Sequence, residues 1–416
     1  INIGVCFMNF AKFFGPLSNL QFDKLLIADV LTTFCDVIMQ FLLIAWILDF
    51  AKNPATPIVG VFISFVAAFL IVSPFCGFFA DKYQKNRLLS ASCFYRTFLA
   101  LIIAGLAFAA GQEQMDIYPF YVLSFLVGVG SSIFYCTKMA FVPEFVETNQ
   151  LKYTNTIFVL TIPFAIVFSG FITNFSIKNA GQPNSFWIFA IVYAIAGLVA
   201  FFVKSSDKIQ KEAGTDTAFL PDVWSVFKYF NTHRHSLYMV FFALIISIFS
   251  SALLYALISL IMDYYFVVTN QFSLIRLYVC AGILIGCLLL FIAARFVKSV
   301  YFFIAAVCVI LPALFSITFC NSYKSSWMWL VPAGIALTVV VVYSNTFLQR
   351  AVPKAIKGKV FALQSALFSL IFAADTLLPL SWARHLPAMP AVKLICILNF
   401  IIMVLITAGY VMTKDE

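Results

Sequence analysis

Long uninterrupted runs of apolar residues, separated by short polar segments, make up almost the whole chain. A helix needs ~20 apolar residues to cross a bilayer, and twelve of the runs approach or exceed that length. Because the runs are continuous rather than alternating, they favour membrane-spanning helices over the strands of a membrane barrel. The predicted spans are residues 25–48, 57–80, 88–110, 118–142, 153–175, 185–203, 236–262, 273–295, 300–320, 327–348, 359–382 and 393–413.

The overall composition agrees with an all-α integral membrane protein. Of the 416 residues, 63% are hydrophobic and 10% are charged, whereas a soluble domain has about 25% charged residues. In lipid, only helices and closed barrels satisfy every backbone hydrogen-bonding group. The 10 cysteines are scattered and form no CxxC pair, so we interpret them as small packing residues rather than a disulfide framework.

The longest polar stretch, residues 204–235, separates two sets of six predicted spans. We therefore expect an amino-terminal six-helix bundle over 1–203, a cytoplasmic linker, and a carboxy-terminal six-helix bundle over 236–416. The linker segment FLPDVWSVFKYF has the character of a short interfacial helix. Segments 141–155 and 347–361 occupy corresponding positions in the two halves, and each contains a proline followed by charges and a new apolar run.

Lysine and arginine are distributed unequally between the two sides that the spans define. With the N-terminus in the cytoplasm, the cytoplasmic loops and the C-terminal tail hold 16 basic residues and the opposite loops hold 5. The 16 are Lys82, Lys85, Arg87, Lys152, Lys204, Lys208, Lys211, Lys228, Arg234, Arg295, Lys298, Arg350, Lys354, Lys357, Lys359 and Lys414, and the 5 are Lys52, Lys178, Lys324, Arg384 and Lys393. Because basic loops stay in the cytoplasm, we expect both termini there. This bias also accounts for the net charge of +9 without nucleic-acid binding.

Four polar residues form a stripe on the first predicted span. Asp29, Thr33, Asp36 and Gln40 are separated by offsets that return to nearly the same azimuth of a helix. A carboxylate at the bilayer centre costs about 2.5–3.5 kcal/mol on insertion scales, so such residues face a water-filled cavity or a charged partner. We expect the stripe to line a central cavity, with Thr33 and Gln40 as secondary members.

Counter-charges lie in other predicted spans. Arg96 is in the third, Lys138 near the inner end of the fourth and Arg276 near the outer end of the eighth, while Asp375 is in the eleventh. The numbers of deep acids and bases therefore match, but the sequence leaves the pairing open. A desolvated carboxylate that loses its partner favours the protonated form, which leads to the hypothesis of proton coupling. Asn345, Gln349 and Gln364 lie at helix ends and are expected to tie helices together.

The segment GFFADKYQKNRL, residues 77–88, connects two spans in a very short hairpin. Its glycine, the aspartate four residues later and the following bases resemble the signature loop of the major facilitator superfamily of transporters. The motif residues are Gly77, Asp81, Lys82, Lys85 and Arg87, and Gln84 replaces the glycine common within the basic run. The resemblance implies two pseudo-symmetric six-helix bundles and a gate at the cytoplasmic face.

Further segments resemble the branch that contains bacterial lysophospholipid transporters and, more distantly, siderophore exporters. ADVLTTFCD is similar to the first-span motif of that branch, with Asp36 at its aspartate and Cys35 in place of a glycine. The resemblance places Arg96 at a basic position and Lys138 at a lysine proposed to meet a lipid headgroup. SNTFLQRAVPKAIKGKVFALQ matches through Gln349, Gly358 and Gln364. The seventh span lacks the basic residue expected in this branch.

These features predict a secondary active transporter that works by alternating access in the bacterial inner membrane. The expected substrate is a small amphipathic molecule such as a lysophospholipid, and the expected coupling ion is the proton. A siderophore or metal-chelate carrier and a drug efflux pump of the same superfamily remain alternatives. An enzyme is disfavoured because no GxSxG, HExxH or Walker pattern occurs. We expect a monomer in contact with membrane lipid, with no cofactor, no metal site and no nucleic-acid partner.

Overall fold

The computed structural model describes residues 16–48, 55–110, 116–204, 219–241, 268–293 and 323–382, together with isolated positions at 309, 397, 401, 404–406 and 408. Within these ranges the ordered elements are helices and no strand occurs. The long helices are α2 (Leu20–Leu48), α3 (Ala55–Lys82), α4 (Lys85–Ala110), α5 (Tyr118–Phe141), α6 (Leu151–Ala180), α7 (Gln182–Phe201), α8 (Phe219–Thr232), α10 (Val268–Ala293), α12 (Tyr323–Ala351) and α13 (Lys357–Trp382). Short 3₁₀ turns cover Pro16–Ser18, Val142–Glu144 and Lys354–Ile356.

Eight of the described helices are long and apolar enough to cross a membrane. They are α2 to α7, α12 and α13, and they coincide with eight of the predicted spans. Helix α10 covers most of a ninth predicted span and contains a shorter apolar stretch, Tyr278–Ile292. The predicted spans 236–262, 300–320 and 393–413 lie wholly or mostly outside the described residues. The prediction of an all-α, multi-pass membrane protein is confirmed.

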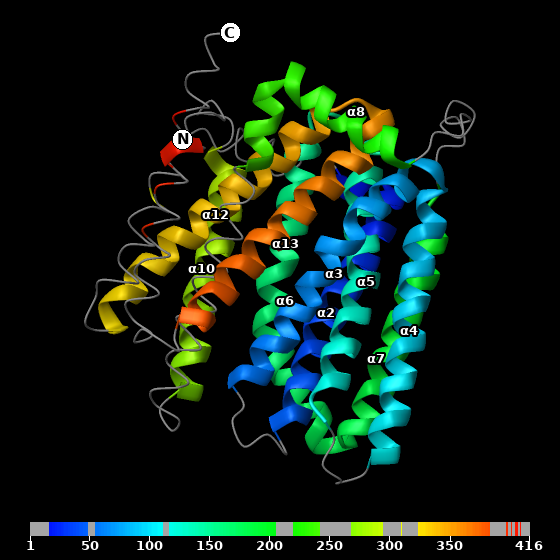
Figure 1. The fold of residues 1–416 in the computed structure, drawn as a ribbon, viewed down its shortest axis with the longest axis vertical. Coiled ribbons are helices and arrows are strands. Elements are labelled where there is room, and N and C mark those ends of the chain that lie inside the picture. Colours follow the sequence, from blue (N-terminus) through cyan, green and yellow to red (C-terminus); the bar gives the residue numbers. More distant parts are fainter. Residues whose placement is uncertain are drawn as a thin grey trace.

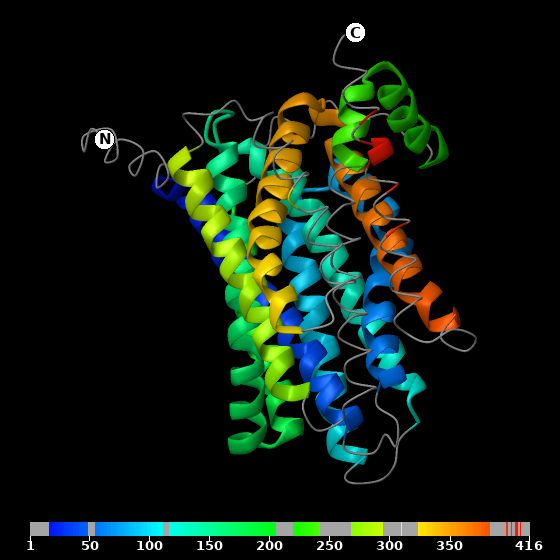
Figure 2. The ribbon, with the colours of Figure 1, turned by 90° about the vertical axis from the view of Figure 1, so that its left-hand side faces the viewer.

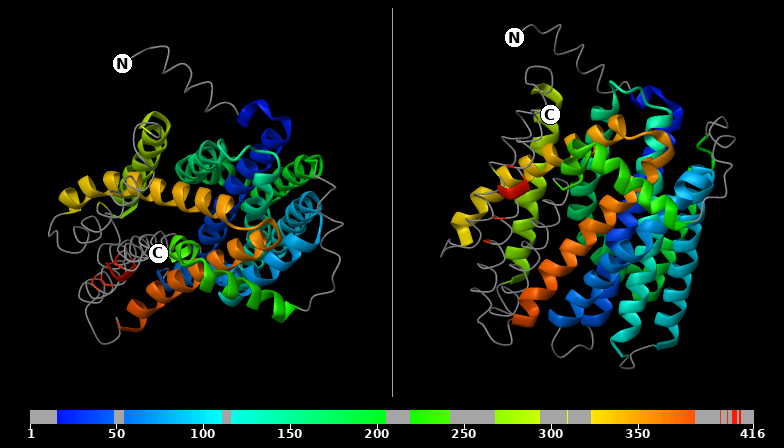
Figure 3. Two further views of the ribbon diagram at one scale, coloured as in Figure 1. Left: turned by 90° about the horizontal axis from the view of Figure 1, so that it is seen from above. Right: turned by 45° about the horizontal axis from the view of Figure 1, so that its top comes forward.

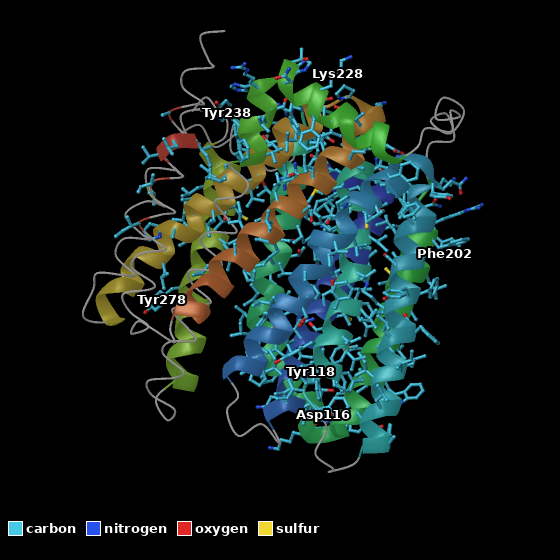
Figure 4. All side chains as sticks on the ribbon, viewed as in Figure 1. Asp116, Tyr118, Phe202, Lys228, Tyr238 and Tyr278 are labelled. Atoms are coloured by element: carbon cyan, nitrogen blue, oxygen red, sulfur yellow. The ribbon has the colours of Figure 1, made fainter. Side chains whose placement is uncertain are left out.

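The spanning helices run roughly along the long axis of the molecule (Figures 1 and 2). Only Tyr83 and Gln84 separate α3 from α4, so the predicted hairpin at residues 77–88 is confirmed. Lys228 on α8 lies at one end of the bundle, and Asp116 and Tyr118 lie at the other (Figure 4). The α3–α4, α5–α6 and α12–α13 connections meet at the Lys228 end, because Lys85, Pro143 and Lys357 line one small hollow there. We call this basic end the cytoplasmic end, as the charge distribution predicts.

Helices α2 to α7 form one group, which we call the amino-terminal group. Within it α4 packs on α7, α3 on α5, and α2 on both α6 and α7. Its interior is apolar, with buried side chains such as Leu42, Ile103 and Phe186. Large apolar side chains such as Phe98 and Phe171 are exposed on the outside. Apolar residues on both the inside and the outside are typical of helices that lie in lipid.

Helices α10, α12 and α13 form a second group, which we call the carboxy-terminal group. Viewed from above, α12 and α13 extend from the other side of the molecule toward α2–α7 (Figure 3). Helix α13 packs along α3 and α5, while α10 and α12 contact α6. A Cβ on Gly77 would lie 2.6 Å from Cβ of Ala362 and 2.8 Å from Cα of Lys359. Gly77 therefore allows the close approach of α3 and α13 near the cytoplasmic end.

Helix α8 forms within the polar stretch that was expected to contain an interfacial helix. The hydroxyl of Tyr229 donates a hydrogen bond of 3.2 Å to the backbone oxygen of Ala351, so α8 is attached to the end of α12. The division of the whole chain into bundles at 1–203 and 236–416 stays a prediction.

Candidate functional site

The polar stripe of the first predicted span lies on α2, and its two aspartates face the interior of the amino-terminal group. Asp29 is 2% exposed, and the side chain of Asp36 is 18% exposed. Each aspartate has a basic partner on another helix. Because a buried charge is stable only when it is paired and hydrogen-bonded, these partners explain how the two carboxylates are accommodated.

Asp36 is paired with Arg96 of α4. Nη1 of Arg96 donates to both carboxylate oxygens of Asp36, at 2.9 Å each. The hydroxyl of Tyr193 on α7 donates to Oδ1 of the same carboxylate at 2.6 Å. Three helices, α2, α4 and α7, therefore meet at one carboxylate, and both oxygens of Asp36 accept hydrogen bonds from charged or phenolic donors.

The guanidinium of Arg96 is enclosed by aromatic rings. Its Cζ lies 5.2 Å from the ring centroid of Phe134 and 5.1 Å from that of Tyr193, distances suited to cation–π attraction. A Cβ on Gly130 would lie 2.6 Å from Cγ of Arg96, so the glycine makes room for the arginine stem. The side chain of Arg96 is 0% exposed, which leaves Asp36 as the exposed member of the pair.

Asp29 is paired with Lys138 of α5. Nζ of Lys138 donates to Oδ1 of Asp29 at 2.6 Å, and it lies 4.7 Å from the ring centroid of Phe158 and 5.8 Å from that of Tyr135. Oδ2 of Asp29 is buried and has no hydrogen-bond partner among the described residues. Asp29 thus has one carboxylate oxygen without a hydrogen-bond partner among the described residues, whereas both oxygens of Asp36 have partners.

The other two members of the stripe differ in burial. Gln40 is buried, and its Oε1 accepts a hydrogen bond of 3.0 Å from the hydroxyl of Ser124 on α5. Its Nε2 has no partner in the described part of the chain. Thr33 is half-buried. Gln40 therefore connects α2 to α5, and the two acidic pairs remain the charged centre of the stripe.

The polar residues expected at helix ends lie where the two helix groups meet. Asn155 of α6 donates to Oε1 of Gln349 at 2.7 Å and to the hydroxyl of Thr346 at 2.9 Å. Nε2 of Gln364 donates to Oδ1 of Asn345 at 3.3 Å, which connects α13 to α12. These bonds form near the cytoplasmic end, and we refer to this contact between the groups as the cytoplasmic seam.

Two more contacts belong to the cytoplasmic seam. The hydroxyl of Ser73 on α3 donates to that of Ser365 on α13 at 3.2 Å. Arg350 at the end of α12 donates from Nη2 and Nε to the backbone oxygen of Thr148, at 2.7 and 3.1 Å. The seam therefore contains hydrogen bonds both in its buried part and at its cytoplasmic edge.

The signature-loop residues are partly described. Gly77 contacts α13, Lys85 forms an ion pair of 2.7 Å with Glu144, and Arg87 is exposed. The side chains of Asp81 and Lys82 lie outside the described residues, as do those of Asp375 and Arg276. The sequence analysis did not single out Glu144 as the partner of Lys85.

Tyr193, Gly130 and Asn155 were missed in the sequence analysis. Tyr193 and Gly130 lie in continuous apolar runs, where tyrosine and glycine are common and carry no distinctive spacing. Asn155 is the last residue of segment 141–155, which corresponds to segment 347–361 in the other half. That repeated pattern is the one signal that could have pointed to Asn155 and its partner Gln349.

Comparison with known proteins relates this arrangement to a family. A family model of the Major Facilitator Superfamily matches residues 25–374. The lysophospholipid transporter LplT of Photorhabdus laumondii subsp. laumondii is 23% identical over 212 residues, which cover 50% of this chain and 49% of that protein. The match therefore spans about half the length of this relative.

Solved structures share the fold at low sequence identity. The human organic anion transporter MFSD10 (TETRAN) superposes with a TM-score of 0.70 at 13% identity, covering 92% of this chain and 98% of that one. A bacterial homologue of the iron transporter ferroportin, in an outward-facing state, gives 0.69 at 14% identity, covering 96% and 100%. Together with the family match over residues 25–374, these results establish that the chain belongs to the Major Facilitator Superfamily of membrane transporters.

Proposed function

We propose that this transporter is a secondary active carrier that moves a small amphipathic substrate with an anionic head, such as a lysophospholipid, together with protons by alternating access. The observation that carries the proposal is the Asp36–Arg96 pair, held by Tyr193 inside an apolar helix group. Charged groups at membrane depth are functional candidates because their insertion is costly. The half-length match to a lysophospholipid transporter supports the substrate class.

Both acidic pairs lie within the amino-terminal group, since α2, α4 and α5 all belong to it. A rigid-body rocking of the two groups would therefore leave both pairs intact. Such a movement alone would not separate either carboxylate from its basic partner. The release has to come from a competitor that takes the place of the carboxylate at Arg96 or Lys138.

An anionic headgroup is such a competitor. Arginine binds phosphate and carboxylate with the same planar set of donors, so a phosphate that reaches Arg96 competes directly with Asp36. The displaced carboxylate would be left without its charged donor in a poorly solvated place, and binding a proton removes that cost. One anionic headgroup and one proton would then enter the site together, which leaves its net charge unchanged.

Lys138 offers a second position for the headgroup. Its ammonium lies among the rings of Tyr135 and Phe158 and is paired with Asp29, whose Oδ2 has no partner among the described residues. A cation bordered by aromatic rings suits an amphiphile, because the rings contact the apolar part while the cation binds the charged head. We assign Thr33 and Gln40 a supporting role in the same stripe.

We assign the signature loop to the cytoplasmic gate rather than to substrate binding. Gly77 permits the close contact of α3 with α13, and the Lys85–Glu144 pair holds the α3–α4 connection to the α5–α6 connection. Asp81, Lys82 and Arg87 are expected to act in the same gate. Asp375 and Arg276 remain cavity candidates from the sequence.

Ligand-dependent thermal stability of the purified protein tests the substrate class. A ligand that binds only the folded state raises the apparent melting temperature with its concentration. We expect stabilisation by a lysophospholipid and not by the corresponding diacyl phospholipid or by an iron chelate, and the stabilisation should be lost in Arg96→Gln. Saturable stabilisation by the iron chelate alone would favour the metal-chelate carrier. Stabilisation by cationic drugs alone would favour the efflux pump.

A further inference from the structure

A second basic site lies at the cytoplasmic edge of the seam, far along the chain from the stripe on α2. A hollow of about 300 Å³ opens between the α5–α6 and α12–α13 connections. These two connections lie in segments 141–155 and 347–361, which occupy corresponding positions in the two halves of the sequence. The hollow is lined by Pro143, Val146, Thr148, Leu151, Gln349, Arg350, Ala351, Val352, Pro353, Lys354 and Lys357.

The charged residues that line this hollow are all basic. Arg350, Lys354 and Lys357 come from the carboxy-terminal group, and the lining contains no carboxylate. Arg350 and Lys357 each have backbone acceptors, since Lys357 donates to the oxygen of Gln349 at 2.6 Å. Lys354 is exposed and has no ion pair or hydrogen bond among the residues that the structure describes.

Other basic residues increase the positive charge around the hollow. Lys152 is on the first turn of α6, next to Leu151, and Lys85 lines an adjoining smaller hollow together with Lys354 and Lys357. Two carboxylates lie near the hollow: Glu144 is paired with Lys85 at 2.7 Å, and Glu147, which stands between the lining residues Val146 and Thr148 in the sequence, is exposed. The basic residues outnumber the carboxylates here, so their mutual repulsion destabilises the closed seam unless a counter-ion lies between them.

The backbone adds to the positive electrostatic potential in the hollow. Leu151 and Lys357 line the hollow and are the first residues of α6 and α13. The first N–H groups of a helix lack intrahelical partners, and the helix dipole is positive at that end. Two helix starts and three basic side chains therefore surround one hollow, with a contribution from each helix group.

We infer that this hollow is an anion site for a phosphate group, which joins the two helix groups while the cytoplasmic seam is closed. The ligand is either a free phosphate compound or the headgroup of an anionic lipid, since both present the same oxygens. The site is independent of the cargo and of the stripe on α2. Its occupation stabilises the closed seam by neutralising the cations at its edge.

Thermal unfolding of the full-length protein tests this inference in two arms. In the first, inorganic phosphate is titrated into detergent-solubilised protein at constant ionic strength against chloride. In the second, the protein is placed in nanodiscs of phosphatidylglycerol or of phosphatidylcholine. We expect a saturable rise in melting temperature in the first arm for a free phosphate compound, or in phosphatidylglycerol over phosphatidylcholine for a lipid headgroup.

The variant Lys354→Gln is the specific probe, because Lys354 is exposed and its loss leaves the packing unchanged. It should raise the half-saturating phosphate concentration about fivefold, as expected for one lost charge contact near the surface. If the ligand is a lipid headgroup, it should instead reduce the stabilisation by phosphatidylglycerol over phosphatidylcholine about fivefold. Lys228→Gln is the matched control, since Lys228 is an exposed lysine on α8 at the same end (Figure 4) and does not line the hollow.

Three results would overturn the inference. The first is that neither arm stabilises the protein. The second is that both variants lose the stabilisation equally, and the third is that Lys354→Gln is stabilised as strongly as the unaltered protein. An effect in one arm that only Lys354→Gln weakens supports the site and identifies its source of phosphate.

Discussion

The phenol of Tyr193 donates a hydrogen bond of 2.6 Å to the carboxylate of Asp36. The same ring lies 5.1 Å from the guanidinium carbon of Arg96. Tyr193 therefore contacts both members of the ion pair, one through its hydroxyl and the other through its ring face. We regard it as the residue that positions the pair for exchange with a substrate headgroup.

Replacing Tyr193 with phenylalanine separates these two contacts. Tyr193→Phe keeps the ring beside Arg96 but removes a hydrogen bond to a charged group, which is worth about 1.5–3 kcal/mol. We expect a lower melting temperature together with a changed transport rate. Tyr83→Phe is the control, because Tyr83 is exposed and its hydroxyl has no such role. Equal melting temperatures for Tyr193→Phe and the unaltered protein would contradict the positioning role.

The Asp29–Lys138 pair is suited to a double-mutant cycle. Removing one partner leaves the other charge buried, so Asp29→Asn and Lys138→Met should each cost about 3–5 kcal/mol. The double variant should cost less than the sum of the two. It should also fold and yet transport poorly, because the cation for the headgroup is gone. Lys178→Met, at an exposed lysine of α6, should change neither property.

An additive cycle would contradict the energetic coupling of Asp29 and Lys138. Full transport by the folded double variant would contradict a role of Lys138 in binding the substrate. The two readouts therefore distinguish a structural pair from a functional one.

The sequence predicted the membrane-spanning helices well and the partners of their charges poorly. Apolar runs of the required length locate spans because the bilayer imposes both length and composition. The stripe on α2 followed from helical periodicity alone. By contrast, Arg96 is 60 positions from Asp36 in the sequence. No local sequence pattern indicates that α2 packs on α6 and α7.

The residues that were missed share a physical reason. Gly130, Tyr193 and Asn155 matter through their contacts with particular neighbours, such as Arg96, Asp36 and Gln349. Such contacts depend on how helices far apart in the sequence are packed. The resemblance to the signature loop singled out Gly77, but only the structure assigns it to the contact between α3 and α13.

Gly77 provides a test of the closed seam. A Cβ at this position would lie within 3 Å of two atoms of α13, and overpacking of this kind costs about 1–3 kcal/mol. We expect Gly77→Ala to lower the melting temperature. Gly105→Ala on α4 is the control, because no atom lies within 4 Å of its Cβ position. Similar melting temperatures for the two variants would show that α3 and α13 are not in close contact.

Two buried cysteines can report on opening of the seam. Cys76 of α3 and Cys136 of α5 are 2% and 0% exposed, in one cluster with Ala362 of α13. Asn155→Ala removes hydrogen bonds to Gln349 and Thr346 across the seam. It should raise the rate at which a maleimide labels these cysteines about fivefold, the effect of about 1 kcal/mol of hydrogen bonding.

Mass spectrometry of the labelled peptides provides the rates for this experiment. Asn179→Ala is the control, because Asn179 is exposed and its amide donates within its own helix, to the oxygen of Phe175. If Asn155→Ala leaves the labelling rates unchanged, its hydrogen bonds do not hold the two helix groups together.

The most direct test of the proposed exchange at Asp36 is lysophospholipid transport into proteoliposomes, measured with and without an inward proton gradient, for the unaltered protein and for Asp36→Asn. The account predicts that the gradient accelerates transport by the unaltered protein. It also predicts that Asp36→Asn, which cannot exchange its carboxylate for a headgroup and bind a proton, loses this acceleration. The account would be contradicted if the unaltered protein moved no lysophospholipid, or if Asp36→Asn responded to the gradient as strongly as the unaltered protein.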